Sequence, residues 1–181
     1  MRGDHDWFQT VTGKRFWPLD PRVEDLDIED IAHGLSMKCR YGGHTLSFFS
    51  VAQHSIIVAD IVERIGSDRQ LILTALMHDA AEAYSADVVR PIKVQMPQFK
   101  EIENKIEAVI AKKYGLIWPF PPIIKWADNT ALNTERRDLL TKTEHAWNQH
   151  DAMILPGRII PWPWHDAKHE FLAAFWRFYN G

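Results

Sequence analysis

The chain has 181 residues, of which 46% are hydrophobic and 25% are charged, and its formal net charge is −3 at pH 7. This length suits one domain with a substantial buried core, so we expect a single domain over residues 1–181. The slightly negative charge gives no general attraction to nucleic acid polymers or anionic membranes. A small anionic ligand is still compatible with it, because a few local Arg and Lys residues can bind one.

Cysteine content and hydropathy bear on the compartment. The single cysteine, Cys39, cannot form an internal disulfide, which favours a reducing environment. No apolar stretch approaches the ~20 residues that a membrane helix needs, and the longest clean run, residues 71–77, is interrupted by Thr74. The first residues, MRGDHDWFQ, are too polar and acidic for a secretory signal. We therefore expect a cytoplasmic protein without membrane or nucleic acid polymer partners.

The N-terminal half contains one turn signal followed by helix signals. Thr12-Gly13 is typical of a turn, which allows a short hairpin within residues 11–21. Asp27 fits a helix N-cap, and acidic residues follow it in the first turn of a helix that extends to about Ser36. Residues 39–45 are polar and contain glycine, so we expect a loop there.

Two segments have the S-x-x-Q form of a capping box. Ser50-Val51-Ala52-Gln53 precedes apolar residues at helical spacing. Ser67-Asp68-Arg69-Gln70 opens a second helix, which we expect over residues 71–84.

The C-terminal half predicts three more helices. Pro97 suits the first position of a helix that ends at Gly115, and Pro122 begins another. Asp166 fits the cap of a last helix that ends near Gly181, whereas residues 87–95 are expected to form a loop. About six helices joined by short loops predict an all-α helical bundle.

Eight tryptophans are unusual for this length. Trp118 and Trp126 flank a Pro-rich stretch, and three more lie within residues 162–176. We interpret them first as aromatic anchors that pack the C-terminal helix onto the core. A subunit interface is the alternative interpretation, because exposed aromatic residues often mark one.

Four His-Asp dipeptides occur in the chain, so the dipeptide alone carries little information. His5-Asp6 lies near a terminus, His150-Asp151 in a polar connection, and His165-Asp166 at the predicted helix cap. Only His78-Asp79 falls inside a predicted apolar helix. Buried His and Asp side chains cost desolvation energy unless they are paired or bound to a metal.

A divalent metal needs more ligands than one dipeptide supplies. His54 and Asp128 both lie in the middle of predicted apolar helices. Either residue alone is more often a hydrogen-bonded packing residue. In the order H…HD…D on three helices, however, they favour a metal site formed by His54, His78, Asp79 and Asp128. Glu82 follows His78 by four residues, which places a proton-transfer carboxylate beside the metal without making it a ligand.

This pattern resembles that of the HD-domain phosphohydrolases, in which all four residues bind one divalent metal within an all-helical core. The segment HDAAEAYSAD is similar to that of the bacterial 5′-deoxynucleotidase group and its phage relatives, which implies catalytic roles for Glu82 and Asp87. In that group a basic residue next to an aromatic one precedes the first histidine. Arg40-Tyr41 is the matching pair here, with Tyr41 in place of tryptophan.

The phrases DIEDIAHGLSMKCRYGGHT, YSADVVRPIK and ADNTALNTERRDLL also resemble small phage and bacterial HD hydrolases. These include the dATP triphosphohydrolases of phages that replace adenine with 2-aminoadenine. The resemblance covers about residues 5–142; the tetrad is specific for the superfamily and weak for the substrate. It implies one divalent ion per site (Mn, Co, Zn or Mg), a homo-oligomer, and the cytosol of a bacterium or of a phage-infected host.

Three functions remain open on this basis. The first is hydrolysis of a purine deoxynucleoside triphosphate, dATP-like, to deoxynucleoside and triphosphate. The second is a 5′-deoxynucleotidase that acts on deoxynucleoside monophosphates. The third is a non-catalytic HD module that binds metal or nucleotide, against which Glu82 and Asp87 argue, because a pure binding module needs no proton-transfer carboxylate.

Several side chains are candidates for supporting roles. Arg40 is expected to stabilise phosphate charge, with Lys93 as a second candidate for binding substrate. His33 and His44 are expected to have packing or ligand-orienting roles. Glu135 is expected to pair with an arginine such as Arg136 or Arg40 and is not counted in the site.

Overall fold

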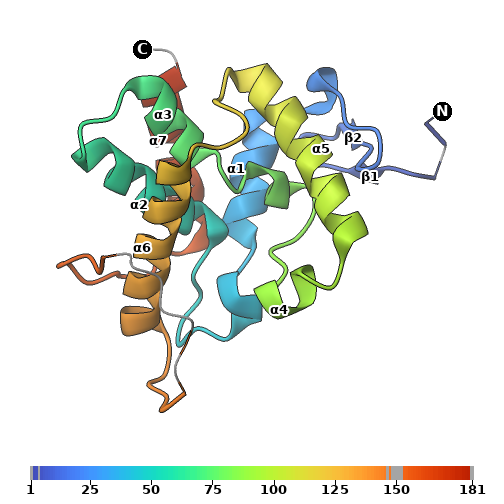
Figure 1. Ribbon diagram of the computed structural model, residues 1–181. Coiled ribbons are helices and arrows are strands. Elements are labelled where there is room, and N and C mark those ends of the chain that lie inside the picture. The colour runs from blue at the N-terminus through green and yellow to red at the C-terminus, as the bar shows by residue number, and fades with distance from the viewer. Residues whose placement is uncertain (1, 4, 146, 148–152, 180–181) are drawn as a thin grey trace.

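A computed structural model describes residues 2–3, 5–145, 147 and 153–179 of the chain (Figure 1). The described residues form seven α-helices, three 3-10 helices and one two-stranded hairpin. The predicted all-α fold is confirmed, although the number of helices is one higher than expected. The elements in chain order are β1 (Phe8–Gln9), β2 (Arg15–Phe16), η1 (Val23–Asp25), α1 (Ile28–Met37), η2 (Arg40–Gly43), α2 (Val51–Arg64), α3 (Arg69–Leu76), η3 (Ala80–Ala83), α4 (Arg90–Lys93), α5 (Pro97–Tyr114), α6 (Pro122–Leu139) and α7 (Trp164–Tyr179).

Helix α2 forms the centre of the bundle and packs against α1, α3, α6 and α7. Ten of its 14 residues are buried. Ser50 caps it as predicted, since its side chain accepts a hydrogen bond from the backbone N–H of Gln53. The other half of the predicted capping box is wrong, because the Gln53 side chain instead bonds the backbone of Ile160 and Trp162. Gln53 thereby ties the segment before α7 to the central helix.

The remaining helix boundaries agree with the sequence at most positions. Asp27 caps α1, and Pro97 and Pro122 begin α5 and α6 as predicted. Gly115 ends α5 in a left-handed conformation with φ 68°, which a glycine adopts without steric cost. Asp68, one residue after the predicted Ser67, caps α3 by accepting from the N–H of Leu71.

Helix α7 differs from its prediction at the start and on its buried face. It begins at Trp164, which places Asp166 in the first turn and not at the cap. Its buried stripe consists of Phe171, Phe175 and Phe178, whose spacing puts them on one face of a helix. Trp164 and Trp176 lie off this stripe and are 42% and 45% exposed, so the anchors of α7 are phenylalanines.

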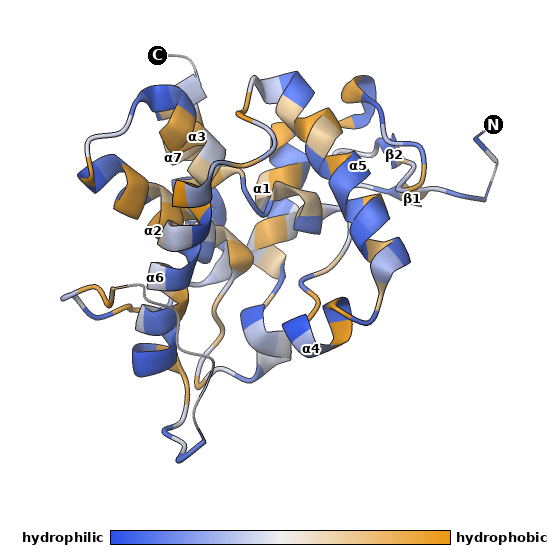
Figure 2. Cartoon of the chain, viewed as in Figure 1, coloured by the Kyte–Doolittle hydropathy of each residue, from blue (hydrophilic) through white to orange (hydrophobic). Residues whose placement is uncertain are grey.

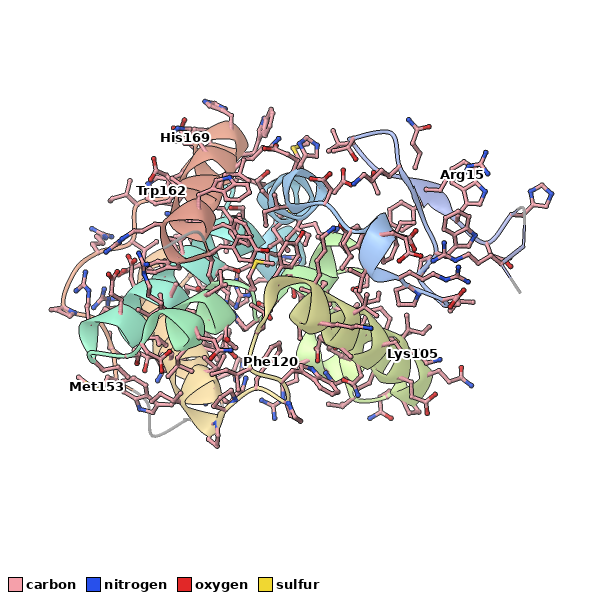
Figure 3. All side chains as sticks on the ribbon, turned by 90° about the horizontal axis from the view of Figure 1, so that it is seen from above. Arg15, Lys105, Phe120, Met153, Trp162 and His169 are labelled. Carbon is pink, nitrogen blue, oxygen red and sulfur yellow. The ribbon has the colours of Figure 1, made fainter. Side chains whose placement is uncertain are left out.

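The other tryptophans of the predicted anchor set divide between core and surface. Trp126 and Trp162 are partly buried against the core, as the anchor interpretation predicts. Trp118 is 42% exposed. Seen from above, Trp162 and His169 lie on the α7 side of the molecule, and Arg15 of the hairpin lies on the opposite side (Figure 3).

The N-terminal hairpin packs against the region that carries the doublet. β1 and β2 pair in antiparallel fashion, with Phe8 opposite Phe16, so the first strand precedes the predicted range while the turn falls at Gly13 as expected. Phe16 is fully buried, and its ring stacks on Tyr84 with 4.0 Å between centroids. The hairpin therefore covers the segment that follows η3.

Helices α5 and α6 stand on either side of η3 (Figure 1). α5 packs against η1, η3 and α4, whereas α6 packs against α2. The outward face of α5 is hydrophilic (Figure 2), and its buried face includes Ile106 and Ile110. The predicted loop over residues 87–95 contains the four-residue helix α4, where Pro91 in the first turn favours helical φ. Among the described helices, none combines the length and the apolar character of a membrane span.

Candidate metal centre

His54 is oriented by a carboxylate on a neighbouring helix. It lies near the start of α2 and is completely buried, and its Nδ1 is 2.6 Å from Oε1 of Glu135 on α6. Although burial raises the pKa of Glu135, the charges of Arg40 and His54 lower it to about 2. The carboxylate is therefore ionised, so the imidazole donates from Nδ1 and its Nε2 is directed elsewhere.

The Nε2 atom of His54 is buried and has no hydrogen-bond partner among the described residues. Burial and Arg40 lower the pKa of His54, but Glu135 and Asp128 outweigh them and raise it to about 9. Nε2 thus holds a proton in the metal-free chain, and a metal ion would replace that proton. A buried ring nitrogen of this kind, with Nδ1 fixed by a carboxylate, is the usual arrangement of a metal-binding histidine.

The His78-Asp79 doublet lies in a turn, so the predicted continuous helix over residues 71–84 is wrong. α3 ends at Leu76, and the 3-10 helix η3 begins at Ala80. In a continuing helix the carbonyl of Ala75 would accept from the N–H of Asp79. Here the Nδ1–H of His78 donates to that carbonyl at 2.8 Å, so the side chain takes the position of the helical hydrogen bond.

This turn fixes the ring of His78 through the Ala75 carbonyl, as Glu135 fixes that of His54. Because a carbonyl only accepts, Nδ1 of His78 carries a proton, and its Nε2 faces Asp79 at 3.2 Å. Nε2 of His78 is buried and forms no hydrogen bond within the described part of the chain. Two buried imidazole nitrogens without a partner are costly, and a bound metal ion removes that cost.

All four predicted ligands converge on one point. Nε2 of His54 lies 3.3 Å from Oδ1 of Asp128 and 3.6 Å from Oδ2 of Asp79. The same Asp79 oxygen lies 3.2 Å from Nε2 of His78. One ligand atom each from His54, His78 and Asp128 lies within 4.8 Å of the others, which is close enough for one ion to contact all three.

The two carboxylates of the cluster are ionised. Burial raises the pKa of Asp79, but His78 and His54 more than compensate, and the pKa lies below its usual range. Burial likewise raises the pKa of Asp128, but the hydrogen bond to His54 and the charge of His54 lower it to well below its usual range. Two imidazoles and two carboxylates are a donor set that suits Zn, Mn, Co or Mg. The residues present therefore fit a divalent ion.

Arg40 and Tyr41 support this cluster from η2. Arg40 is 9% exposed; its Nε lies 3.2 Å from Oε2 of Glu135 and its Nη1 lies 3.6 Å from Oδ2 of Asp79. The Tyr41 hydroxyl donates to the same Glu135 oxygen at 2.6 Å. Tyr41 has φ 57° and ψ 28°, a left-handed conformation that costs a non-glycine residue about 1 kcal/mol. The bond to Glu135 holds it there.

Glu135 is the residue of this site that sequence reasoning left out. It was expected to pair with Arg136 or Arg40, and it does pair with Arg40, but it also binds His54 and Tyr41. Glu135 follows Asp128 by seven residues, which is about two turns, so both lie on the same face of α6. The seven-residue spacing from Asp128 is the sequence feature that could have identified Glu135 as part of the site.

A cavity of about 280 Å³ adjoins the cluster. Three of the predicted ligands line it, together with residues of α5 and of the Pro-rich segment before α6. Phe120 of that segment lies between the two helices (Figure 3). The residues that line it are His78, Asp79, Ala81, Glu82, Lys93, Lys100, Glu103, Glu107, Phe120, Pro121, Pro122, Ile124, Lys125 and Asp128.

Glu82 reaches this cavity from η3 and not from the predicted α-helical turn. It is 7% exposed, and one of its oxygens, Oε2, has no partner among the described residues. Burial, together with the charges of Asp79 and Asp87, raises its pKa well above the usual range. A buried carboxyl group with a raised pKa is suited to general acid catalysis.

The remaining predicted residues lie at different distances from the cavity. Lys93 lines it, and its Nζ is 3.7 Å from Oε1 of Glu82. Asp87 is half-buried, and burial raises its pKa. Asp87, Arg40 and Tyr41 are not among the described residues that line the cavity.

Within the described part of the chain, the other histidines do not join the cluster. His33 packs edge-on against Trp164 with 5.7 Å between centroids, and His44 is exposed. His5-Asp6 is exposed, as is His165-Asp166. His150-Asp151 lies outside the described residues.

Comparison with known proteins finds a family match and two similar proteins. Residues 51–155 match the HD domain family, and this range contains His54, His78, Asp79 and Asp128. The chain is 42% identical over 137 residues to the uncharacterized protein YfdR of Escherichia coli, which covers 74% of this chain and 72% of that protein. It is 35% identical over 167 residues to an uncharacterized protein of Rhodobacter capsulatus, covering 85% of each.

Proposed function

Because the chain belongs to the HD domain family, whose members are generally metal-dependent phosphohydrolases, we propose that it hydrolyses a deoxynucleoside triphosphate. The first candidate is a dATP-like purine nucleotide, with deoxynucleoside and triphosphate as products. The observation that carries this proposal is the position of Glu82, a buried carboxyl with an unpartnered oxygen in the same cavity as the ligand cluster.

His54, His78, Asp79 and Asp128 would hold the divalent ion through two imidazole nitrogens and two carboxylate groups. When bound, such an ion supplies Lewis acidity that withdraws charge from a phosphate and favours ionisation of water. The chain itself orients the ligands, since Glu135 fixes the ring of His54 and the Ala75 carbonyl fixes that of His78.

Glu82 would act on the leaving group. Hydrolysis at the α-phosphate breaks the bond between phosphorus and the 5′ oxygen of the deoxyribose, which leaves as an alcohol and needs a proton. Glu82 would supply that proton, since burial and the charges of Asp79 and Asp87 raise its pKa. Asp87 would thus assist catalysis through its charge, as well as by orienting water or a sugar hydroxyl.

Arg40 would balance phosphate charge. Its guanidinium contacts Asp79 and Glu135, so it is held beside the ligand cluster by two carboxylates. A planar guanidinium in a fixed position binds phosphate oxygens with directional hydrogen bonds. Tyr41, which follows it, would contact the sugar or the base.

A 5′-deoxynucleotidase activity on deoxynucleoside monophosphates is the second candidate. The cavity volume of about 280 Å³ favours it, since pockets for small organic ligands commonly span about 300–1,000 Å³ and a monophosphate needs less room than a triphosphate. Lys100 and Lys125, which line the cavity beyond Lys93, favour the longer phosphate chain.

Product analysis separates these activities. The purified chain, loaded in turn with Mn, Co, Mg or Zn, is incubated with deoxy- and ribonucleoside mono-, di- and triphosphates. Release of triphosphate with deoxynucleoside supports the first candidate, and release of inorganic phosphate from monophosphates supports the second. Nucleotide binding without any turnover would instead identify a non-catalytic HD module. The proposed homo-oligomer is checked in the same samples by light scattering.

A further inference from the structure

Glu103 is a buried carboxylate in the cavity wall that takes no part in the ligand cluster. It lies on α5, is 2% exposed, and lines the same cavity as His78 and Asp79. Burying a carboxylate is unfavourable unless charged donors compensate it. Two lysines do so here: Nζ of Lys93 lies 2.6 Å from Oε1, and Nζ of Lys100 lies 3.0 Å from Oε2.

Lys93 links this carboxylate to the proposed catalytic one. Lys93 is the last residue of α4, which contacts α5, so its ion pair with Glu103 connects the two helices. Its Nζ also lies 3.7 Å from Oε1 of Glu82. The ammonium is therefore placed between two carboxyl groups, in close contact with Glu103 and at a longer distance from Glu82.

The two distances have a consequence for hydrogen bonding. An ammonium group has three N–H donors, and a separation of 3.7 Å is too long for a normal hydrogen bond. Glu103 therefore occupies one donor of Lys93 and leaves others available in the cavity. Burial lowers the pKa of Lys93, but the hydrogen bond to Glu103 and the charge of Glu103 raise it, so the group stays cationic.

The position of the ammonium depends on Glu103 because a lysine side chain is long and flexible. Four rotatable bonds let an unanchored ammonium move toward solvent or toward Glu82. If the ammonium moved toward Glu82, it would form a direct ion pair with the carboxyl group that is proposed to donate a proton. Glu103 prevents both movements by holding the ammonium at 2.6 Å.

We propose that Glu103 is a positioning residue that fixes the Lys93 ammonium at the cavity wall, where it binds a phosphate oxygen of the nucleotide. This inference rests on the proposed function, since it assigns the anionic part of that substrate to one place in the cavity. The ligand chemistry is a phosphate group adjoining the ligand cluster.

The test compares Glu103→Gln, Lys93→Met and the double variant, with dATP and Mn²⁺ as substrate and metal and with dAMP as a second substrate. Glu101→Gln is the matched control, because it makes the same change at an exposed position of α5. We expect Glu103→Gln to raise KM on the order of tenfold, the effect of losing one charge-assisted hydrogen bond, with a smaller change in kcat. Glu101→Gln should leave both constants unchanged.

Coupling between the two positions distinguishes positioning from a merely structural role. If Glu103 acts through Lys93, the double variant has the KM of Lys93→Met alone. Effects on KM that multiply in the double variant overturn the proposal, as does an unchanged KM in Glu103→Gln. Glu103→Asp keeps the charge and shortens the side chain, so it should show a smaller increase and covers the case in which the glutamine variant does not fold.

Failure of the inference is separable from failure of the proposed function. Turnover by the wild-type chain in the same assay decides the proposed function. Binding of inorganic triphosphate and of inorganic phosphate to the metal-loaded variants, measured by calorimetry, decides the inference even where no nucleotide is hydrolysed. Weaker binding in Glu103→Gln and in Lys93→Met supports it, and unchanged binding in both overturns it.

Discussion

The imidazole of His54 donates a hydrogen bond from Nδ1 to the completely buried carboxylate of Glu135, at 2.6 Å. This bond joins α2 to α6 and fixes which ring nitrogen faces the ligand cluster. Glu135 also receives hydrogen bonds from Arg40 and Tyr41, so one carboxylate orients a proposed metal ligand and two proposed substrate-binding residues.

Replacing Glu135 by glutamine should weaken metal binding by about 10- to 100-fold, because the ring of His54 loses the charged partner that fixes its orientation and basicity. Competition with a chelator of known affinity measures the change. Asp138→Asn, on the same helix and outside the cluster, is the control and should bind metal normally. An unchanged affinity in Glu135→Gln would show that the His54–Glu135 bond has no influence on the site.

Replacing Asp79 by alanine should remove metal and activity together, since one oxygen of this carboxylate lies within 3.6 Å of both imidazole Nε2 atoms. Metal content by mass spectrometry and turnover are measured on the same sample. Asp87→Asn provides the comparison, because Asp87 is half-buried nearby without being a proposed ligand. It should lower turnover and retain the metal; full metal content in Asp79→Ala would remove Asp79 from the ligand set.

Glu82→Ala should abolish turnover while the metal stays bound. The proposed role of Glu82 is to supply a proton, and its carboxyl has an oxygen without a partner among the described residues. Metal content and turnover are again measured on the same sample, and together they show whether Glu82 is a proton donor or a metal ligand. Loss of the metal in this variant would instead make Glu82 a ligand.

Several features of this fold could be predicted from residues that are close together in the sequence. Ser50 and Asp27 are N-caps that act within three residues of their own position, so the sequence contains both partners of each hydrogen bond. The sequence also predicted that His54, His78, Asp79 and Asp128 come together, and they do lie close together, while their role as metal ligands stays a prediction. A polar residue within an apolar run, such as His54 or His78, is a signal that the sequence displays.

Other features depend on contacts that no local pattern contains. The run Ala80–Ala83 has high helix propensity, yet the His78 side chain ends the helix by bonding the Ala75 carbonyl. Glu103 and Glu135 are recognised by partners ten and 81 residues away, Lys93 and His54. Their roles follow from how α4, α5, α6 and α2 pack, and that packing is a property of the whole chain.

Arg40→Ala should do more than weaken substrate binding, which was the expectation from sequence. Arg40 is buried beside Glu135, and removing one partner of a buried ion pair leaves the other charge uncompensated. We expect the free energy of unfolding to fall by about 3 kcal/mol, measured by urea denaturation. Arg40→Lys keeps the charge and should lose less. An unfolding free energy equal to that of the wild type in Arg40→Ala would mean that Glu135 finds another donor.

Gly34→Ala should disturb the candidate site indirectly, by displacing η3. Gly34 lies on α1 where that helix meets η3, and a Cβ added there would come within 3.0 Å of the Ala83 carbonyl oxygen and 3.1 Å of its Cα. These are backbone atoms, so the strain cannot be relieved by a side-chain rotation, and η3 has to move. We expect a loss of about 1–3 kcal/mol in the free energy of unfolding.

The same shift should lower kcat, because Ala83 directly follows Glu82 and displacing η3 moves the proposed proton donor. Gly157→Ala is the matched control: its added Cβ meets nothing within 4 Å, so stability and kcat should match the wild type. Both variants are assayed at saturating metal, so a reduced kcat cannot arise from an empty site. A Gly34→Ala variant with wild-type kcat but reduced stability would show that the position of η3 does not control Glu82.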